Sequence, residues 1–347
     1  MKNVLVTGSS GLVGSEATLF FLKKKFKVIG IDNNQRANFF GKDGDTNWIK
    51  RKNLQYENYR HFNIDITDYK KLEKIFIQYK NKIDLIIHAA AQPSHDWAYQ
   101  NPRLDFKINA EGTLNMLELF KKYNKKSVFI LTSTNKVYGD LPNKLNLTEK
   151  KTRWELPKKN IFFKGIPENF SIDNSTHSLF GVSKAYGDLI TQEYGKNFSL
   201  KTGVFRAGCI TGPNHSGAKL HGFLSYLVKS CVIKKEYNLI GYKGKQVRDN
   251  IHSHDLVRCF WEYYKKPKKG EVYNIGGGRY SNCSILEAIT YIESTRAIKV
   301  KKIITKKERT GDHQWYITDL KKFKTHYPKW KLKYNTKKII DEILENY

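Results

Sequence analysis

The chain begins with a short apolar run that breaks directly into a glycine-rich turn. Val4-Leu5-Val6 leads into Thr7-Gly8-Ser9-Ser10-Gly11-Leu12-Val13-Gly14, the order expected where a buried parallel strand turns into a helix. In that context Gly8 permits the tight turn, Gly11 lets the backbone approach a pyrophosphate, and Gly14 lets the helix pack close to the strand. Free N–H groups at the helix N-terminus then point towards an anion. The segment therefore predicts a dinucleotide-binding turn.

A carboxylate follows at the position where such a turn needs one. The apolar run 27–31 ends at Asp32, about 20 residues beyond the glycines, where an acidic side chain meets a ribose 2′-hydroxyl. The same charge repels a 2′-phosphate. Asp32 therefore predicts NAD as the cofactor rather than NADP.

Apolar runs alternate with amphipathic stretches through the first part of the chain. We expect strands and helices at the following positions: strands 4–6, 27–31, near 60–64, 84–88, 127–132 and 201–205; helices at about 12–24, 68–79, 103–123 and 180–195. This alternation predicts an α/β fold, a doubly wound parallel sheet of the Rossmann type with helices on both faces.

After about residue 207 the alternation loosens into turn-rich sequence with a helix near 220–232, which predicts a smaller C-terminal α/β lobe. We divide the chain into an NAD-binding domain at 1–206, to which the segment of about 245–275 returns, and a mainly substrate-binding lobe at 207–347. Two polar insertions, about 35–58 and 141–176, are longer than simple connectors, so we expect them to be substrate loops or disordered.

The composition narrows the classes of partner. The 62 Lys+Arg against 33 Asp+Glu give a formal charge of +29, but the lysines are spread along the chain without a nucleic-acid-binding motif. We therefore expect a solvated basic surface that favours an anionic small molecule, and no nucleic-acid partner. The four cysteines lack zinc-ligand spacing, which predicts no metal site and a reducing compartment. We expect no signal peptide and no membrane insertion, and hence a cytoplasmic protein.

The chain resembles the extended short-chain dehydrogenase/reductase family, the nucleotide-sugar epimerases and dehydratases, over nearly its full length. The resemblance rests on these marks: Thr7 to Gly14, Asp32, Asp65-Ile66, His88 to Ala90, Asn109, Ser133-Thr134 followed by Val137-Tyr138-Gly139, Lys184, Arg248-Asp249, and Arg309 with Gly311-Asp312. The strings 133–141 and 244–249 look most like the branch of CDP-paratose 2-epimerases (CDP-tyvelose epimerases).

The resemblance implies roles for individual residues. Thr134 would bond the reacting hydroxyl, Lys184 would bind the nicotinamide ribose, and Arg248 and Arg309 would grip the substrate diphosphate. The cofactor would contact Gly8, Ser10, Gly11, Leu12, Val13, Asp32, Asn33, Asp65, Ile66, Ala89, Ala90, Ala91, Asn109, Thr132 and Lys184. The substrate would contact Thr134, Asn135, Asn214, Arg248, Arg309 and Asp312.

One departure from the family pattern concerns the proton-transfer group. The family carries Tyr-x-x-x-Lys, whereas this chain has Phe180-Gly181-Val182-Ser183-Lys184, and a phenyl ring carries no exchangeable proton. A positioned acid/base is worth about 10²–10⁴ in rate. Three explanations stay open. Another group transfers the proton, namely His177, His95 or, less readily, Tyr138 or the Lys184 ammonium. Alternatively, the chemistry occurs at another position of the substrate, or the site is inactive.

The resemblance implies an NAD-dependent epimerase of a nucleotide-activated hexose that oxidises a sugar carbinol to a ketone and reduces it again, feeding surface-polysaccharide assembly. We expect a CDP-sugar substrate, with GDP- and UDP-sugars as alternatives, and a homodimer formed through the helices near 103–123 and 180–195. A dehydratase or dehydrogenase of the same family, and a non-catalytic NAD/sugar-nucleotide-binding protein, remain alternatives. Asn135 and Lys136 stand where a dehydratase would carry an Asp-Glu pair.

Overall fold

A seven-stranded parallel sheet forms the centre of the larger half of the molecule. The computed structural model describes residues 1–214, 222–296, 298–305 and 311–346. The strands lie in the order β12-β8-β5-β4-β1-β2-β3, and their bounds are β1 Asn3–Thr7, β2 Lys27–Ile31, β3 Tyr59–Phe62, β4 Leu85–His88, β5 Val128–Thr134, β8 Lys201–Ala207 and β12 Glu271–Ile275. The order reverses between β1 and β4, which confirms the predicted doubly wound α/β sheet.

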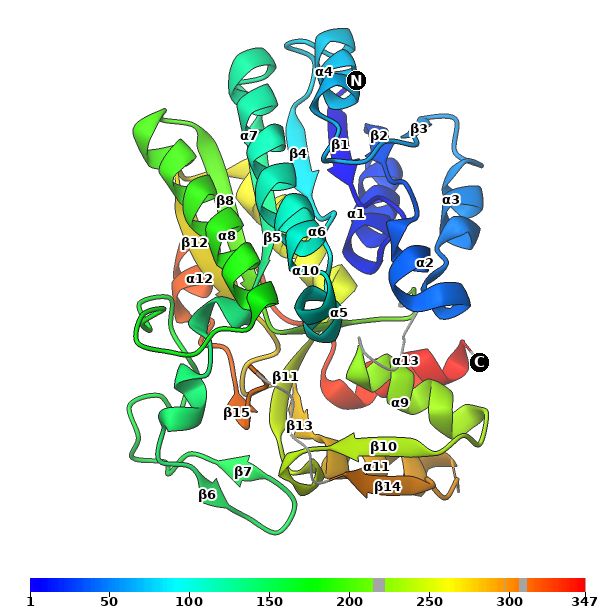
Figure 1. Ribbon diagram of the computed structural model, residues 1–347, viewed down its shortest axis with the longest axis vertical. Helices are drawn as coiled ribbons and strands as arrows, with labels where there is room; N and C mark the ends of the chain where they lie inside the picture. Colours follow the sequence, from blue (N-terminus) through cyan, green and yellow to red (C-terminus); the bar gives the residue numbers. More distant parts are fainter. Residues whose placement is uncertain (215–221, 297, 306–310, 347) are drawn as a thin grey trace.

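The strands are apolar at successive positions because both sheet faces are buried. Val4 and Val6 of β1 pack on one side and Leu5 packs on the other. The first face is covered by α1 Leu12–Lys23, α10 Ser253–Lys265 and α12 Lys321–His326; the second is covered by α4 Tyr69–Gln78, α7 Gly112–Tyr123 and α8 Leu179–Asn197. In Figure 1, α7 and α8 lie in front of the sheet and α10 lies behind it.

The helix expected at 103–123 is continuous in direction but irregular in hydrogen bonding. It consists of α6 Pro102–Phe106, a π-helical turn at Lys107–Glu111, and α7. Asn109 lies in that turn and bonds outside the helix: its Nδ2 donates to the Gln92 carbonyl oxygen at 3.1 Å, and its Oδ1 accepts from the Gln92 N–H at 3.0 Å. These tertiary bonds accompany the local widening of the helix.

A smaller half lies below the sheet in Figure 1. A mixed sheet joins β9 Cys209–Thr211, β11 Val247–His252, β13 Asn282–Ser284 and β15 Trp315–Tyr316, and a second parallel pair joins β10 Tyr237–Ile240 and β14 Lys302–Thr305. The helices α9 Phe223–Val232, α11 Ile285–Arg296 and α13 Thr336–Glu345 share an apolar core with these strands. This half matches the smaller C-terminal lobe predicted from the sequence.

The two long insertions are ordered, and they lie in different places. The first carries α2 Gln35–Phe40 and α3 Asn47–Asn53 beside the carboxyl end of β2. The second carries the short antiparallel pair β6 Thr148–Glu149 and β7 Trp154–Glu155, and its Leu156 and Ile166 are buried against Trp315.

The remaining short helix, α5 His95–Gln100, follows β4. In the described part of the chain no helix is both long enough and apolar enough to span a bilayer.

A buried ion pair ties α8 to the sheet. Arg206, on β8, donates from Nε and Nη2 to the two carboxylate oxygens of Asp188, at 3.0 and 2.8 Å. Asp188 is fully buried and also accepts from Ser133 Oγ at 2.6 Å, while Arg206 Nη1 donates to Tyr138 Oη at 3.0 Å. The bidentate geometry satisfies both charges. The network therefore holds α8 against the ends of β5 and β8.

Asp188→Ala should lower the free energy of unfolding by about 3–5 kcal/mol, because it leaves the Arg206 guanidinium buried without its partner. The surface pair between Lys265 and Glu262 provides the control. Glu262→Ala should cost only about 0–1 kcal/mol. Urea unfolding of the three proteins checks this, and equal losses from the two substitutions would contradict it.

Candidate active site

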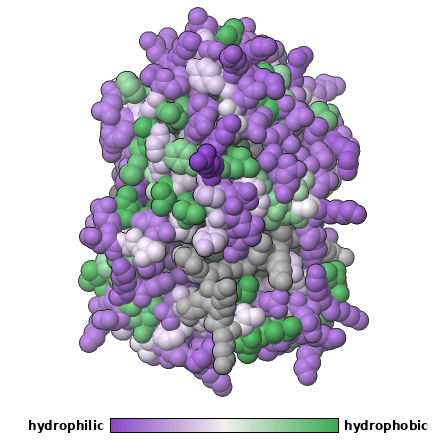
Figure 2. Space-filling model, in the orientation of Figure 1, coloured by the Kyte–Doolittle hydropathy of each residue, from purple (hydrophilic) through white to green (hydrophobic). Residues whose placement is uncertain are grey.

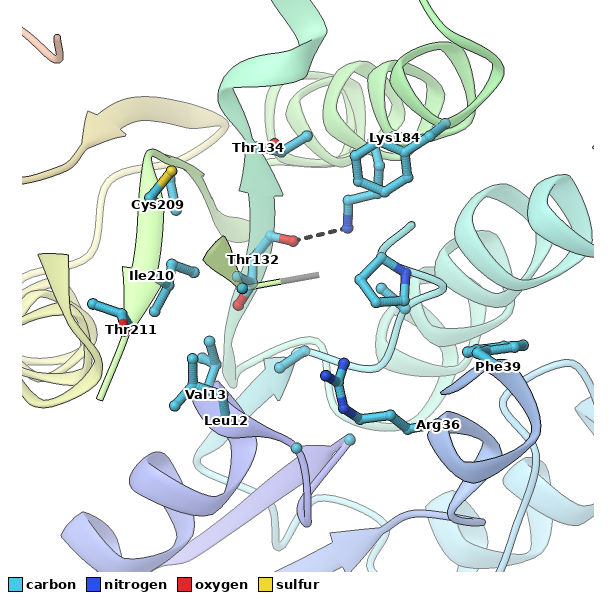
Figure 3. Close-up of a pocket in the computed structure, with 18 of the residues that line it drawn as sticks. Leu12, Val13, Arg36, Phe39, Thr132, Thr134, Lys184, Cys209, Ile210 and Thr211 are labelled. Atoms are coloured by element: carbon cyan, nitrogen blue, oxygen red, sulfur yellow. Dashed lines mark hydrogen bonds between the residues drawn. The ribbon is translucent and has the colours of Figure 1, made fainter. Parts of the chain in front are cut away.

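A cavity of about 460 Å³ runs along the carboxyl edge of the large sheet and continues into the smaller half. Its walls come from the ends of β1, β2, β4 and β5 on one side and from the segments around β9, β10 and β11 on the other. Figure 3 shows Leu12 and Val13 of α1 at one end and Thr134 and Lys184 at the other, with Cys209, Ile210 and Thr211 along the side. Ligands of open α/β sheets bind at this edge.

The glycine turn forms a cradle that no side chain could share. Gly8 has φ +67°, and a Cβ there would lie 2.8 Å from the Ala90 backbone nitrogen. A Cβ on Gly14 would lie 1.9 Å from the Gly8 carbonyl oxygen, so α1 can approach the turn only with glycine at this position. Gly11 precedes α1 without a side-chain cap, and Gly11, Leu12 and Val13 line the cavity. The first N–H groups of α1 therefore remain for a bound anion.

Asp32 is held at the cavity wall by two backbone N–H groups. Its Oδ2 accepts from Ser10 N at 2.9 Å, and its Oδ1 accepts from Asn34 N at 2.7 Å. Asn33 donates from Nδ2 to Asp65 Oδ2 at 3.1 Å. The other expected cofactor contacts that line the cavity are Gly8, Asn33, Asp65, Ile66, Ala89, Ala90, Ala91, Thr132 and Lys184.

Two expected cofactor residues lie outside the cavity as the described residues outline it. Ser10 supports Asp32 through its backbone N–H, and Asn109 lies behind the wall with bonds to Asp105 at 3.0 Å and Ser183 at 3.1 Å. Thr132 Oγ1, in contrast, is buried in the wall without a hydrogen-bond partner among the described residues. A buried hydroxyl without a partner is costly, so this atom fits a site that receives a polar ligand.

The first insertion adds residues to the cavity wall that were not predicted from the sequence. Arg36, Phe39 and Thr46 line the cavity beside Asp32, and the ring of Phe39 packs on Trp97 with centroids 4.4 Å apart. Burial lowers the pKa of Arg36 to about 10. An arginine four residues after the acidic end of β2 is the signal that could have placed it. The second insertion, expected to be a substrate loop, contributes no described residue to the cavity wall.

Lys184 and Thr134 face the cavity from α8 and the end of β5. Lys184 Nζ donates to the Thr132 carbonyl oxygen at 3.0 Å, the dashed line in Figure 3. Burial lowers the pKa of Lys184 to about 8, against the opposing charges of Asp105 and Asp188. Thr134 Oγ1 accepts from Lys136 N at 3.2 Å. The ammonium and the hydroxyl thus share one end of the cavity.

Phe180 lies one helical turn before Lys184 and lines the same end of the cavity, with 7% of its surface exposed. His95, the first residue of α5, packs on it with ring centroids 4.8 Å apart and also lines the cavity. His177 lies outside the cavity as the described residues outline it, with Nε2 2.8 Å from the Val137 carbonyl oxygen and Nδ1 3.2 Å from that of Ser175. The structure brings only one of the two candidate histidines to position 180.

A cluster of charges lies where the cavity enters the smaller half. Arg248 Nη2 donates to Asp312 Oδ1 at 2.6 Å, and Lys136 Nζ lies 3.4 Å from the same oxygen and 3.0 Å from the Gly311 carbonyl oxygen. Burial would raise the pKa of Asp312, but Arg248 and Lys136 hold it well below its usual range. Burial lowers the pKa of Lys136. Asn135 and Asn214 also line the cavity, whereas Arg309 lies outside the described residues.

Lys136 was missed as a charged cavity residue by sequence reasoning, which treated it only as a replacement for a dehydratase carboxylate. Its place two residues after Thr134 was the available signal.

Among the described residues, no cluster of three or more His, Cys, Asp and Glu side chains is arranged to hold a metal ion. The four cysteines are free thiols.

The lowered pKa of Lys184 makes stability depend on pH. The unfolded chain binds this proton up to its ordinary pKa of 10.5, while the folded chain releases it at about 8. The free energy of unfolding should therefore rise from pH 8 to 10.5, by up to about 3 kcal/mol, relative to a Lys184→Met variant. Urea unfolding of the nucleotide-free proteins checks this. In a Lys196→Met control, on the exposed side of α8, the free energy of unfolding should change with pH as it does in wild type. A difference between wild type and Lys184→Met that stays constant across this pH range would refute the lowered pKa of Lys184.

Comparison with known proteins places this geometry in a family. Residues 4–276 match the model of the NAD dependent epimerase/dehydratase family. CDP-paratose 2-epimerase of Salmonella typhi is 30% identical over 342 residues, 96% of each chain. The fold matches the structure of UDP-glucose 4-epimerase of Bifidobacterium longum in complex with NAD⁺ and UDP, with a TM-score of 0.79 and 24% identity over 99% of this chain and 97% of that one. It also matches UDP-glucuronic acid 4-epimerase of Bacillus cereus in complex with UDP-glucuronic acid and NAD, with a TM-score of 0.77 and 22% identity over 99% of this chain and 98% of that one. The chain belongs to the NAD-dependent nucleotide-sugar epimerase/dehydratase family.

Proposed function

We propose that the protein is an NAD-dependent epimerase of a nucleotide-activated hexose, with a CDP-deoxysugar epimerised at C2 as its first candidate substrate. The observation that carries this proposal is the single cavity that connects the glycine cradle, the pair Thr134 and Lys184, and the charged cluster at Arg248. A dinucleotide and a sugar nucleotide together need these three regions, for the two diphosphates and for the reacting carbon. The relationship to the Salmonella typhi CDP-paratose 2-epimerase supports the choice of sugar nucleotide.

The residues present fit NAD. Glycine at positions 8 and 14, where a Cβ would collide with backbone atoms, lets α1 begin close to β1 with its N-terminus beside the cavity, as a bound pyrophosphate needs. Asp32 offers a fixed carboxylate to a ribose hydroxyl. When bound, NAD would supply a reversible two-electron acceptor. Thr134 would then hold the sugar hydroxyl by a hydrogen bond, and the Lys184 ammonium would favour negative charge in its surroundings.

The charged cluster fits the diphosphate of the substrate. Arg248 has a planar guanidinium that can meet phosphate oxygens with two donors, and Lys136 adds a second cation beside it. Gln246 lies farther along the cavity, with a buried Oε1 that has no partner among the described residues. Its Nε2 donates to the Ile240 carbonyl oxygen at 2.9 Å, so Oε1 remains as an acceptor for the ligand.

The sequence disfavours one alternative function and favours another. A dehydratase needs carboxyl groups beside Thr134 for elimination, and Asn135 and Lys136 disfavour it. Phe180 instead favours a protein that binds NAD and a sugar nucleotide without turning the sugar over. That second candidate predicts retained binding and no inverted product.

Purified protein should carry NAD(H), released by denaturation and measured by its absorbance and by chromatography. Incubation with CDP-, GDP- and UDP-hexoses should give an epimer detected by NMR, with the CDP-sugar converted fastest. NAD-loaded protein that binds a sugar nucleotide but leaves every sugar unchanged would support the binding-only alternative. Absence of affinity for NAD in either oxidation state would refute both.

We also propose a homodimer formed through α8 and the neighbouring α6. Leu179, Val182 and Leu189 recur at helical spacing along α8 with 46%, 54% and 43% of their surfaces exposed, and Phe106 of α6 is 52% exposed beside Tyr186. Figure 2 shows apolar side chains gathered on the left of an otherwise mostly hydrophilic face, over the position of α8 in Figure 1. An apolar stripe of this kind is typical of a helix–helix interface.

Val182→Glu combined with Leu189→Glu should convert a dimer into a monomer in sedimentation velocity, because the substitutions place charges in an apolar interface. Ile77→Glu on α4, at a residue 53% exposed, is the matched control and should leave the dimer intact. A wild-type protein that sediments as a monomer would contradict the proposal.

A further inference from the structure

The phenyl ring at position 180 leaves the cavity without the proton-transfer group that the rest of the site requires. Thr134 and Lys184 line the cavity, and Phe180 lines it beside them with no atom that can bind a proton. We infer that the His95 imidazole, whose ring packs against Phe180 at a tilt, accepts and returns the proton of the reacting sugar hydroxyl. This inference rests on the proposed epimerase function and identifies the residue that replaces the phenol.

His95 reaches the phenyl ring from a different element of the fold. It begins α5, its ring centroid lies 4.8 Å from that of Phe180 at an interplanar angle of 56°, and both residues line the cavity. Its charge also helps to lower the pKa of Asp312, so the imidazole lies within electrostatic reach of the charged cluster. The imidazole thus lies on the cavity wall near both position 180 and the cluster proposed for the diphosphate.

The backbone that carries His95 is fixed by buried hydrogen bonds. Ser94 caps α5, its Oγ accepting from Trp97 N at 3.3 Å. Gln92, fully buried, donates from Nε2 to the Ser94 carbonyl oxygen at 2.9 Å and to Asp105 Oδ1 at 2.6 Å, and its Oε1 accepts from Ser94 N. A residue that transfers protons must be held in place by its neighbours. Gln92 and Asp105 provide that support, which an ordinary surface loop would lack.

Two other candidate proton-transfer residues, His177 and Tyr138, lie outside the cavity. His177 has both ring nitrogens directed at backbone carbonyl oxygens, those of Val137 and Ser175. Tyr138 is fully buried, its hydroxyl donates to Asn274 Oδ1 at 2.8 Å, and burial raises its pKa to about 12. Neither residue lines the cavity as the described residues outline it. Neither can therefore reach a sugar without rearrangement of the fold.

Two lysines do line the cavity, and both ammonium groups are bound to backbone oxygens. Lys184 donates to the Thr132 carbonyl and Lys136 to the Gly311 carbonyl, each at 3.0 Å. To accept a sugar proton, either would first have to be deprotonated and leave its acceptor. Imidazole is the side chain whose unperturbed pKa suits proton transfer near neutral pH. Geometry and chemistry thus favour His95.

The step balances with a nicotinamide cofactor as oxidant. His95 would take the hydroxyl proton while the carbon that bears the hydroxyl loses its hydrogen as a hydride, which NAD⁺ would receive, leaving a ketone. The imidazolium would return the proton to the same oxygen when the hydride is added back to the other face of the ketone. No net oxidation results, and His95 ends as it began.

His95→Gln in the NAD-loaded protein should lower the epimerisation rate by about 10²–10⁴, while NAD content and affinity for CDP stay within threefold. Added imidazole should restore part of the activity of His95→Ala. His326→Gln, a histidine 2.9 Å from Tyr273 Oη and outside the cavity wall, is the matched control and should match wild type.

A second measurement needs no turnover. The chain has 10 histidines, and the imidazole proton signals of His95 can be assigned by their loss in His95→Gln. These signals should shift when CDP-glucose binds and stay in place when CDP binds, with the UDP and GDP pairs run alongside. A shift equal for sugar nucleotide and nucleotide, or a shift with neither, would overturn the role.

Failure of the proposed function can be distinguished from failure of the role assigned to His95. Wild-type protein that holds NAD but converts no sugar nucleotide overturns the proposed function and this inference with it. Wild-type protein that converts a sugar while His95→Gln matches it overturns only the role of His95. A gain of tenfold or more from Phe180→Tyr would also overturn it, because the phenol would then be the group that the site lacks.

Discussion

The close approach of α1 to the turn at Gly8 is the contact on which the rest of the site depends. With only hydrogen atoms at Gly8 and Gly14, the helix begins almost on top of the strand, and its N-terminus opens onto the carboxyl edge of the sheet. The same edge collects the ends of β2, β4 and β5, which bring Asp32, Ala89 and Thr134 to one cavity. A side chain at Gly14 would push α1 away and separate these parts.

The far end of the cavity depends on charge rather than on close packing. Asp312 lies between Arg248 and Lys136 and neutralises part of their charge inside a buried region. A diphosphate would compete with this carboxylate for the same cations. Part of the positive charge that is spread along the chain thus lies on two side chains at this end of the cavity, in addition to Arg36 and Lys184 elsewhere on its wall.

The sequence predicted the features that depend on local pattern. The β1–turn–α1 unit, the alternation of strands and helices and the smaller lobe follow from apolar periodicity and glycine spacing, and the structure confirms them. Features set by tertiary contact were out of reach. The π-turn at Asn109 accompanies bonds to Gln92, and the segment 141–176 packs beneath Trp315 because its apolar residues meet the smaller lobe. Lys136 is one basic residue among 62, and His95 and His177 looked equivalent until their loops were placed.

The segment after β5 has a mechanical consequence. Thr134 ends β5, and the residues that follow it are hydrogen-bonded to the segment just before β15. Asn143 Nδ2 donates to the Asp312 carbonyl oxygen at 2.9 Å, and His313 Nε2 lies 2.7 Å from the Gly139 carbonyl oxygen. The cavity wall at Thr134 and the wall at Asp312 are therefore held at a fixed separation by these two bonds. If a sugar nucleotide binds as we propose, that separation would limit the length of the ligand that can contact both walls at once.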